Sequence, residues 1–137
     1  MLYISEPLVR ILKNAWFVRF ARAQKISDDT LREAIMRAES GQVDADLGGG
    51  VLKQRIARLG QGKSKGYRTI ILFREGYRAF FVYGFAKSER DNIRKDEEEQ
   101  FKKMAKHVLG LSEAQLNILI ANGQIEEVES NDEKVSK

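Results

Sequence analysis

Two consecutive runs of the sequence, residues 67–74 and 77–85, are apolar at nearly every position. A strand covered on one face alternates apolar and polar residues, so a continuous apolar run indicates a strand covered on both faces. Glu75-Gly76 separates the two runs and suits a tight hairpin. The chain must therefore place one layer of structure on each face of this antiparallel pair.

Residues 51–58 show the alternating pattern of a half-buried strand. Its apolar side holds Leu52 and Ile56, and its polar side holds Lys53 and Arg55. Together with the two apolar runs, this strand predicts a three-stranded antiparallel meander.

The segment before the meander predicts a short strand followed by two helices. The strand covers 9–13, where β-branched residues are frequent. Asn14 is a plausible N-cap for a helix over 15–24, and Ser27 caps a second helix that ends at Gly41. The spacing of their apolar residues predicts a helical hairpin that covers the sheet.

The segment after the meander predicts two more helices and an edge strand. The first helix covers about 96–109, its acidic first turn suits the helix dipole, and Gly110 ends it. Ser112-Glu-Ala-Gln115 is a capping box that opens a short helix to Ala121. Residues 125–129 are typical of an edge strand.

These elements define an α+β fold with the order strand, helix, helix, antiparallel meander, helices. A chain of 137 residues with no apparent linker or internal repeat fits one domain over 1–137. We expect its core at about 9–122, with 123–137 as an acidic C-terminal extension.

Basic residues concentrate between Gly48 and Arg94. This stretch holds eleven Lys or Arg and three acids, although the whole chain has a formal net charge of only +4. The eleven are Lys53, Arg55, Arg58, Lys63, Lys65, Arg68, Arg74, Arg78, Lys87, Arg90 and Arg94. A solvated charged surface is the ordinary explanation of such a run. Clustering on strands with few acids between favours a working face that attracts polyphosphate in a salt-dependent way.

The sequence offers little for metal or cofactor chemistry. It contains no cysteine and one histidine, His107, near the end of an amphipathic helix. The acids at 96–99 are consecutive, so they fan around a helix and do not converge. We therefore predict no metal and no cofactor. No apolar run approaches the roughly 18 residues of a membrane span, and no signal peptide is recognisable. The expected location is the cytoplasm, with no membrane partner.

Gly62-Lys63-Ser64 invites comparison with a phosphate-binding loop. Such a loop needs a glycine five residues earlier, where this chain has Ala57, and a helix directly afterwards. Residues 67–70 look like a strand instead. The segment 60–66 is therefore predicted to be a flexible basic hairpin loop.

Most aromatic residues of the meander must be buried, because strands this apolar need a core. Tyr67 is the candidate most expected to be exposed, since it flanks the basic loop and precedes Arg68. An exposed tyrosine there would offer a stacking surface for a base.

Three segments resemble the RelE/ParE toxin superfamily, and in particular its HigB-like, RelE-type branch. They are Asp46-Leu-Gly-Gly-Gly-Val-Leu-Lys-Gln-Arg-Ile-Ala-Arg58, Gly60-Gln-Gly-Lys-Ser-Lys-Gly-Tyr-Arg68 and Phe85-Ala-Lys-Ser-Glu-Arg-Asp-Asn-Ile93. The resemblance covers roughly 9–122. It implies a compact β-α-α-β-β-β-α toxin of a type II toxin–antitoxin module that cleaves mRNA in the ribosomal A site. It also implies a cognate antitoxin, often with a helix-turn-helix DNA-binding domain.

The same resemblance implies roles for individual residues. Arg68 matches the arginine expected on the scissile phosphate, and Lys53 and Arg55 match the paired cations of the preceding strand. Lys87 and Arg90 match further active-site cations. The cations and the tyrosine assigned to RNA or ribosome binding are Arg58, Lys63, Lys65, Tyr67, Arg74 and Arg94.

The sequence departs from the better-known members in two places that bear on catalysis. Ser88 stands where they have a basic residue, and no tyrosine lies near Arg94. Leu59 also stands where members of the branch often have proline.

The chemistry that fits these residues is attack by the ribose 2′-OH of RNA on the neighbouring phosphate. The RNA supplies its own nucleophile, and fixed cations stabilise the charge that builds on the phosphate oxygens, so no metal is needed. Arg68 is the best bidentate clamp, and either Lys53 or Lys87 is the group that exchanges protons. Two alternatives stay open: a gyrase inhibitor like ParE, and a non-catalytic module that binds RNA or the ribosome.

Overall fold

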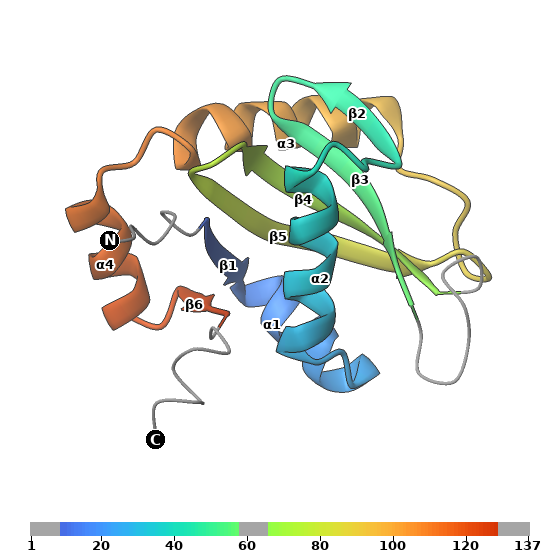
Figure 1. Cartoon of the computed structure of the whole chain (residues 1–137), viewed down its shortest axis with the longest axis horizontal. Helices are drawn as coiled ribbons and strands as arrows, with labels where there is room; N and C mark the ends of the chain where they lie inside the picture. Colours follow the sequence, from blue (N-terminus) through green and yellow to red (C-terminus); the bar gives the residue numbers. More distant parts are fainter. Residues whose placement is uncertain (1–8, 58–65, 129–137) are drawn as a thin grey trace, which may run out of the picture.

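The computed structural model describes residues 9–57 and 66–128. A mixed sheet has the strand order β2-β3-β4-β5-β1-β6 and carries helices on both faces (Figure 1). The strands are β1 (Arg10–Asn14), β2 (Ala45–Gly48), β3 (Val51–Ile56), β4 (Tyr67–Arg74), β5 (Arg78–Ala86) and β6 (Ile125–Glu127). The helices are α1 (Ala15–Gln24), α2 (Asp28–Glu39), α3 (Lys95–Val108) and α4 (Glu113–Ala121). The α+β class is confirmed.

The central hairpin is confirmed nearly to the residue. β4 has the predicted limits, and β5 begins one residue later than expected. Gly76 has φ +71°, a left-handed conformation that a residue without Cβ adopts at little cost. Leu72 and Phe81 are fully or almost fully buried. The continuous apolar pattern was therefore a sound guide to a strand covered on both faces.

Two features of the sheet differ from the expectation. β2 was missed: residues 45–48 pair antiparallel with β3 through the turn at Gly48-Gly49-Gly50. The strand is only four residues long and lies at the sheet edge, so it leaves no periodic signal. The sheet is also not purely antiparallel, because β1 pairs parallel with β5 after the chain crosses over through α1 and α2.

The predicted helices are confirmed, with shifts of a residue or two at some ends. Asn14 and Ser27 accept hydrogen bonds from the backbone N–H groups of the first turns of α1 and α2. Ser112 and Gln115 form the expected capping box of α4. β6 pairs with β1 at the position where an edge strand was predicted.

Two cores lie on opposite faces of the sheet. On one face, α1 and α2 cover a cluster that includes Phe17, Ile35 and Phe81. On the other face, α3 and α4 cover a cluster that includes Leu72 and Leu116. Figure 1 shows α2 crossing in front of the sheet while α3 runs behind it. This arrangement leaves Lys53, Arg55 and Arg68 on the α3 face of the sheet.

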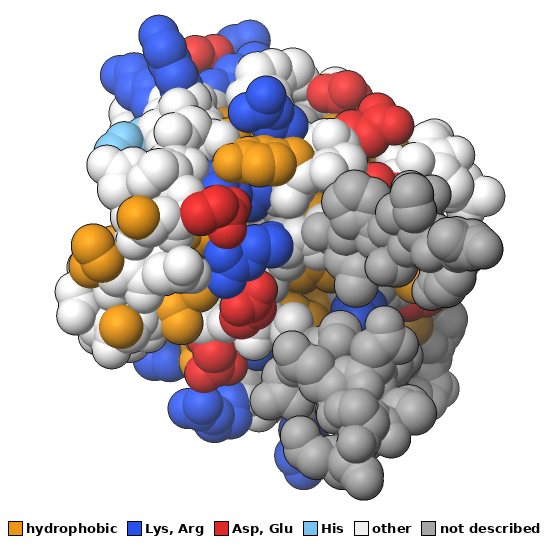
Figure 2. Space-filling view, turned by 60° about the vertical axis from the view of Figure 1, so that its left-hand side comes forward, with side chains coloured by type: hydrophobic (Ala, Val, Ile, Leu, Met, Phe, Trp, Pro, Cys, Tyr) orange, Lys and Arg blue, Asp and Glu red, His pale blue; other side chains and the backbone are white. Residues whose placement is uncertain are grey.

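Arg78 anchors the C-terminal elements to the sheet. Its side chain is completely buried and donates to the carbonyls of Val108 and Leu111 and to Glu113 Oε2, the last at 2.7 Å. Arg10 binds the other oxygen of Glu113 and also reaches β6. Acidic and basic side chains alternate on this face of the molecule (Figure 2). Arg78, one of the eleven cations of the basic segment, is therefore structural.

Candidate active site

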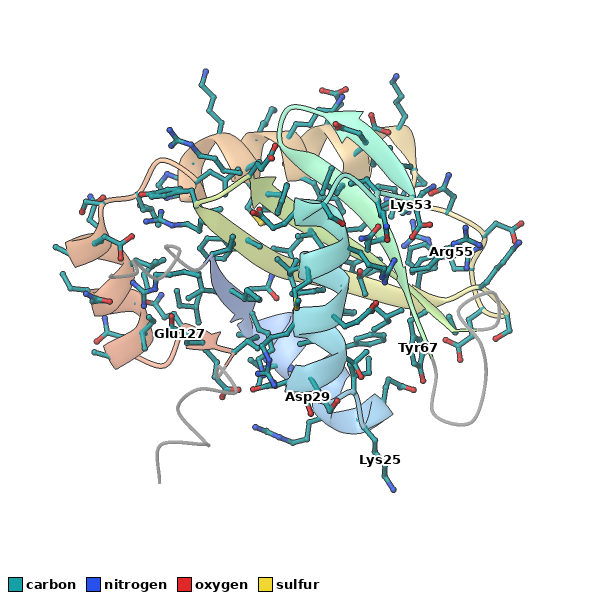
Figure 3. All side chains as sticks on the ribbon, in the orientation of Figure 1. Lys25, Asp29, Lys53, Arg55, Tyr67 and Glu127 are labelled. Carbon is teal, nitrogen blue, oxygen red and sulfur yellow. The ribbon has the colours of Figure 1, made fainter. Side chains whose placement is uncertain are left out.

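The strand register brings three predicted cations onto one face of the sheet. Arg55 on β3 pairs directly with Arg68 on β4, and Lys53 pairs with Ile70 one step along. Side chains opposite one another on neighbouring strands have Cβ atoms roughly 5 Å apart. Figure 3 shows Lys53 and Arg55 close together on β3. The cationic cluster, meaning Lys53, Arg55 and Arg68, is thus assembled by the backbone.

A shift of register in β5 brings aromatic rings beside these cations. Ile70 pairs with Tyr83 and the next residue, Ile71, pairs with Phe81, which leaves one extra residue on β5. Such a bulge changes the face to which the following side chains point. Phe81 belongs to the core under α1, whereas Tyr83 packs against the core on the opposite face, where it contacts Phe101 of α3 and also Trp16 at the start of α1. Phe85 is the direct neighbour of Arg68 on the same face.

Arg68 has unused hydrogen-bonding capacity. The side chain is half-buried, and its Nη1 atom is buried without a hydrogen-bond partner. A guanidinium nitrogen in this position is costly unless an acceptor arrives, and an oxyanion is the best acceptor. Of the three clustered cations, Arg68 is therefore the one prepared to bind an anion.

Asp44 and Asn92 fix the other two cations of the cluster. Asp44 accepts from the Arg55 backbone N–H at 2.6 Å and from its guanidinium at 3.2 and 3.3 Å. Lys53 Nζ donates to Asn92 Oδ1 at 3.1 Å. Each of these two cations therefore has a partner that orients it before any ligand arrives.

Arg90 lies against the aromatic side of the site. Its guanidinium is 5.6 Å from the ring centre of Tyr83 and 5.8 Å from that of Phe85, and it donates to the Tyr83 hydroxyl. It also forms an ion pair with Glu97. The hydrogen bond to Glu97 raises the pKa of Arg90, while a hydrogen bond from the Arg94 backbone lowers the pKa of Glu97. Both groups stay charged near neutral pH, so Arg90 is a fixed cation and does not transfer protons.

The remaining predicted residues are dispersed. Lys87 is exposed in the turn after β5, at the end of the sheet that carries Arg68. Arg94 is exposed at the start of α3 and pairs with Asp96 at 3.0 Å. Three predicted binding residues, Arg58, Lys63 and Lys65, lie outside the described residues.

Two predicted binding residues lie away from the cationic cluster. Tyr67 is only 3% exposed, and its hydroxyl donates to Gln24 at 2.7 Å while its ring packs edge-on against Phe20. It is part of the core, because α1 covers the face to which it points, and it offers no stacking surface. Arg74 lies six residues from Arg68 at the opposite end of β4, so it does not belong to the cluster.

Sequence reasoning missed the residues that hold the cations in place. Asp44 gave no signal, since it precedes a strand that was itself missed. Asn92 lies in the segment 85–93, which resembles the toxin family but contains no local pattern that assigns a role to this residue. Tyr83 and Phe85 were not named as site residues, because the bulge that turns them toward the cations is invisible in the sequence; the prediction that most aromatic residues of the meander are buried holds for Phe85, which is 5% exposed.

Within the described residues, no group of three or more His, Asp or Glu side chains is arranged to hold a metal ion. No helix in the same part of the chain combines the length and the apolar character of a membrane span.

The fold and the site together define a small α+β protein with a preassembled cationic face beside aromatic rings. A family model described as the RelE toxin of the RelE/RelB toxin–antitoxin system matches residues 9–128. The chain belongs to this RelE toxin family. Toxins of the family are typically ribosome-dependent endoribonucleases, and membership implies a cognate antitoxin as partner. A search of curated proteins finds no significant match.

Proposed function

We propose that this protein is a ribosome-dependent mRNA endonuclease that cleaves the message in the ribosomal A site and so stops translation. Family membership supports the toxin role. The observation that carries the catalytic part is the buried, unpartnered Nη1 of Arg68 beside Arg55 and Lys53. We further propose that the toxin belongs to the HigB-like branch, acts in the cytoplasm, and is neutralised by an antitoxin with a helix-turn-helix domain.

The reaction we propose needs no nucleophile from the protein. The ribose 2′-OH attacks the adjacent phosphorus, the bond to the 5′-oxygen breaks, and the products are a 2′,3′-cyclic phosphate and a free 5′-OH. One proton leaves the 2′-OH and another is delivered to the leaving oxygen. The chemistry requires a group that accepts the first proton, one that donates the second, and stabilisation of the pentavalent phosphorus between them.

Arg68 and Arg55 supply the charge stabilisation. Negative charge grows on the non-bridging oxygens as the 2′-oxygen approaches, and donors already aimed at that position lower the barrier without reorganising. Arg68 has the free donor, and Asp44 holds Arg55 in place. No metal ion is required for this step, because guanidinium groups fulfil the electrostatic role.

Lys53 and Lys87 are the candidates for proton transfer. Lys53 lies within the cluster on a fixed hydrogen bond, and Lys87 is exposed in the turn after β5. The pH–rate profiles of Lys53→Arg and Lys87→Arg separate them, because only the variant that removes a titrating group changes the shape of the profile.

The test is cleavage of a message on purified ribosomes by wild-type protein and by Arg68→Ala. We expect the variant to bind ribosomes but to cleave about 10²–10³-fold more slowly, the usual loss when one transition-state donor is removed. Arg19→Ala, which removes an exposed cation on α1, is the matched control and should cleave normally. Full cleavage by Arg68→Ala would refute the proposed role of Arg68 in stabilising the phosphate. Inhibition of DNA supercoiling by the wild type without RNA cleavage would refute the nuclease itself.

A further inference from the structure

A second concentration of cations lies at the C-terminal end of α3, away from the cationic cluster. A groove of about 460 Å³ is bounded by the β2–β3 turn, the end of β4 and the second half of α3. Among the described residues that line it, Arg74, Lys102 and Lys106 are cations and none is acidic. Blue side chains gather at the top of the molecule, the height at which α3 lies in Figure 1 (Figure 2).

The glycine turn between β2 and β3 builds one wall of this groove. Gly49 and Gly50 adopt φ values of +62° and +83°, which favour glycine. A Cβ on Gly49 would lie 3.1 Å from Lys102 Cγ, and one on Gly50 would lie 3.1 Å from Leu109 Cδ1. The absence of both Cβ atoms allows α3 to approach the turn and lay the stem of Lys102 across it. The groove is thus a product of close packing and not of a loose loop.

The charges of the groove are only partly compensated. Lys102 pairs with Glu98 at 3.1 Å, one turn earlier on α3. Arg74 stacks over the ring of Tyr77 at 4.8 Å, an arrangement that leaves its charge in place. Lys106 is exposed. Two of the three cations therefore remain available to an anionic ligand.

The lining indicates which part of a nucleic acid the groove recognises. No described residue that lines it is aromatic. Base recognition by single-stranded RNA binders depends on stacking surfaces. A cationic groove without them binds the phosphate backbone, independently of sequence.

The groove is too far from the cluster to hold the same phosphate. Arg74 and Arg68 are six residues apart on β4, a separation of roughly 20 Å along a strand. Between them the face is covered by α3, with Ala105 almost fully buried. A ligand in the groove is therefore a second contact point, separate from the strand under attack.

We propose that this groove binds the phosphate backbone of ribosomal RNA and orients the toxin on the ribosome. The inference rests on the proposed ribosome-dependent function. It adds a binding site through which the toxin contacts the ribosome independently of the message. The groove contributes affinity for the ribosome, and the cationic cluster carries out the cleavage of the RNA.

The experiment compares Arg74→Gln/Lys106→Gln with the control Arg19→Gln/Lys103→Gln, which removes two exposed cations outside the groove. Binding to purified ribosomes and to a short free single-stranded RNA is measured over a series of salt concentrations. Loss of two phosphate contacts should weaken ribosome binding at physiological salt on the order of tenfold and reduce the slope of log K against log salt by about 1.5. The kcat for cleavage at saturating ribosome concentration should be unchanged.

The outcomes are distinguishable from those that test the proposed function. Equal losses in both double variants, or no loss in either, would overturn the inference while leaving wild-type cleavage untouched. A loss confined to the free RNA would assign the groove to the message and would also overturn the inference. Arg74→Lys/Lys106→Arg keeps both charges and should restore binding. Failure of the wild type to cleave at all would refute the proposed function alone.

Discussion

Replacement of Arg78 by leucine should destabilise the protein without disabling the cationic cluster. Arg78 is fully buried and donates to two backbone carbonyls, the Tyr77 hydroxyl and Glu113. Leucine cannot donate, so the carbonyls of Val108 and Leu111 lose a donor that the folded chain supplies. Each such loss in a buried setting costs about 1–3 kcal/mol.

Two effects reduce the total. Glu113 is half-exposed, with 54% of its side chain accessible, so water replaces part of the ion pair. Leucine also removes the buried Nε of Arg78, which has no hydrogen-bond partner. We therefore expect a net loss of about 3 kcal/mol in the free energy of unfolding. For a domain of this size that corresponds to a fall in Tm of roughly 10–15 °C.

The assay is urea denaturation of wild type, Arg78→Leu and Arg74→Leu. Arg74 is the direct cross-strand neighbour of Arg78 but is exposed, so its replacement should change stability by less than about 0.5 kcal/mol. Cleavage per folded molecule should survive in Arg78→Leu. A loss under about 1 kcal/mol in Arg78→Leu would contradict the reasoning that the buried donors hold the α3–α4 connection to the sheet.

Two further predictions concern the carboxylates that hold arginines. Asp44→Asn should reduce the cleavage rate about tenfold while changing the free energy of unfolding by less than about 1 kcal/mol, because the partly exposed ion pair adds little stability but orients Arg55. Single-turnover kinetics and urea denaturation curves test this prediction. An unchanged cleavage rate would show that Arg55 does not need Asp44. The pKa of Glu113 lies below its ordinary value because Arg78 and then Arg10 donate hydrogen bonds to it. Its contribution to stability is therefore complete above the ordinary glutamate pKa of about 4.3 and is lost as the pH falls through the lower, folded-state pKa. Glu113→Gln should flatten this acid branch of the stability profile, and an unchanged branch would assign it to other carboxylates.

Much of the fold was predictable because its strongest signals are local. The limits of β4 follow from a continuous apolar run that ends at the Glu75-Gly76 turn, and the caps of α1, α2 and α4 follow from side chains that bind their own first turn. β2 was missed for the opposite reason. Four residues at a sheet edge are stabilised by pairing with β3, which no local pattern reports.

The site was predictable to the extent that strand alternation determines it. Lys53 and Arg55 had to share a face, and pairing with β4 then places Arg68 beside them. The error at Tyr67 has a clear origin. Its neighbourhood in sequence is cationic and polar, but its neighbourhood in space is α1, which reaches it from more than forty residues away through Gln24.

The bulge in β5 explains how one hairpin provides both a core and a site. Without the extra residue, Tyr83 and Phe85 would follow Phe81 onto the α1 face, and Arg90 would lose the rings that support it. With it, the first half of β5 fills the cores and the second half turns aromatic surface toward the cations. The same strand also carries Arg78, whose buried hydrogen bonds fix the far end of the sheet. The cations between Gly48 and Arg94 therefore act in different ways according to their position in the sheet. Arg78 stabilises the fold, and the cationic cluster forms the proposed active site. Arg74 lines the groove at the opposite end of β4 from Arg68.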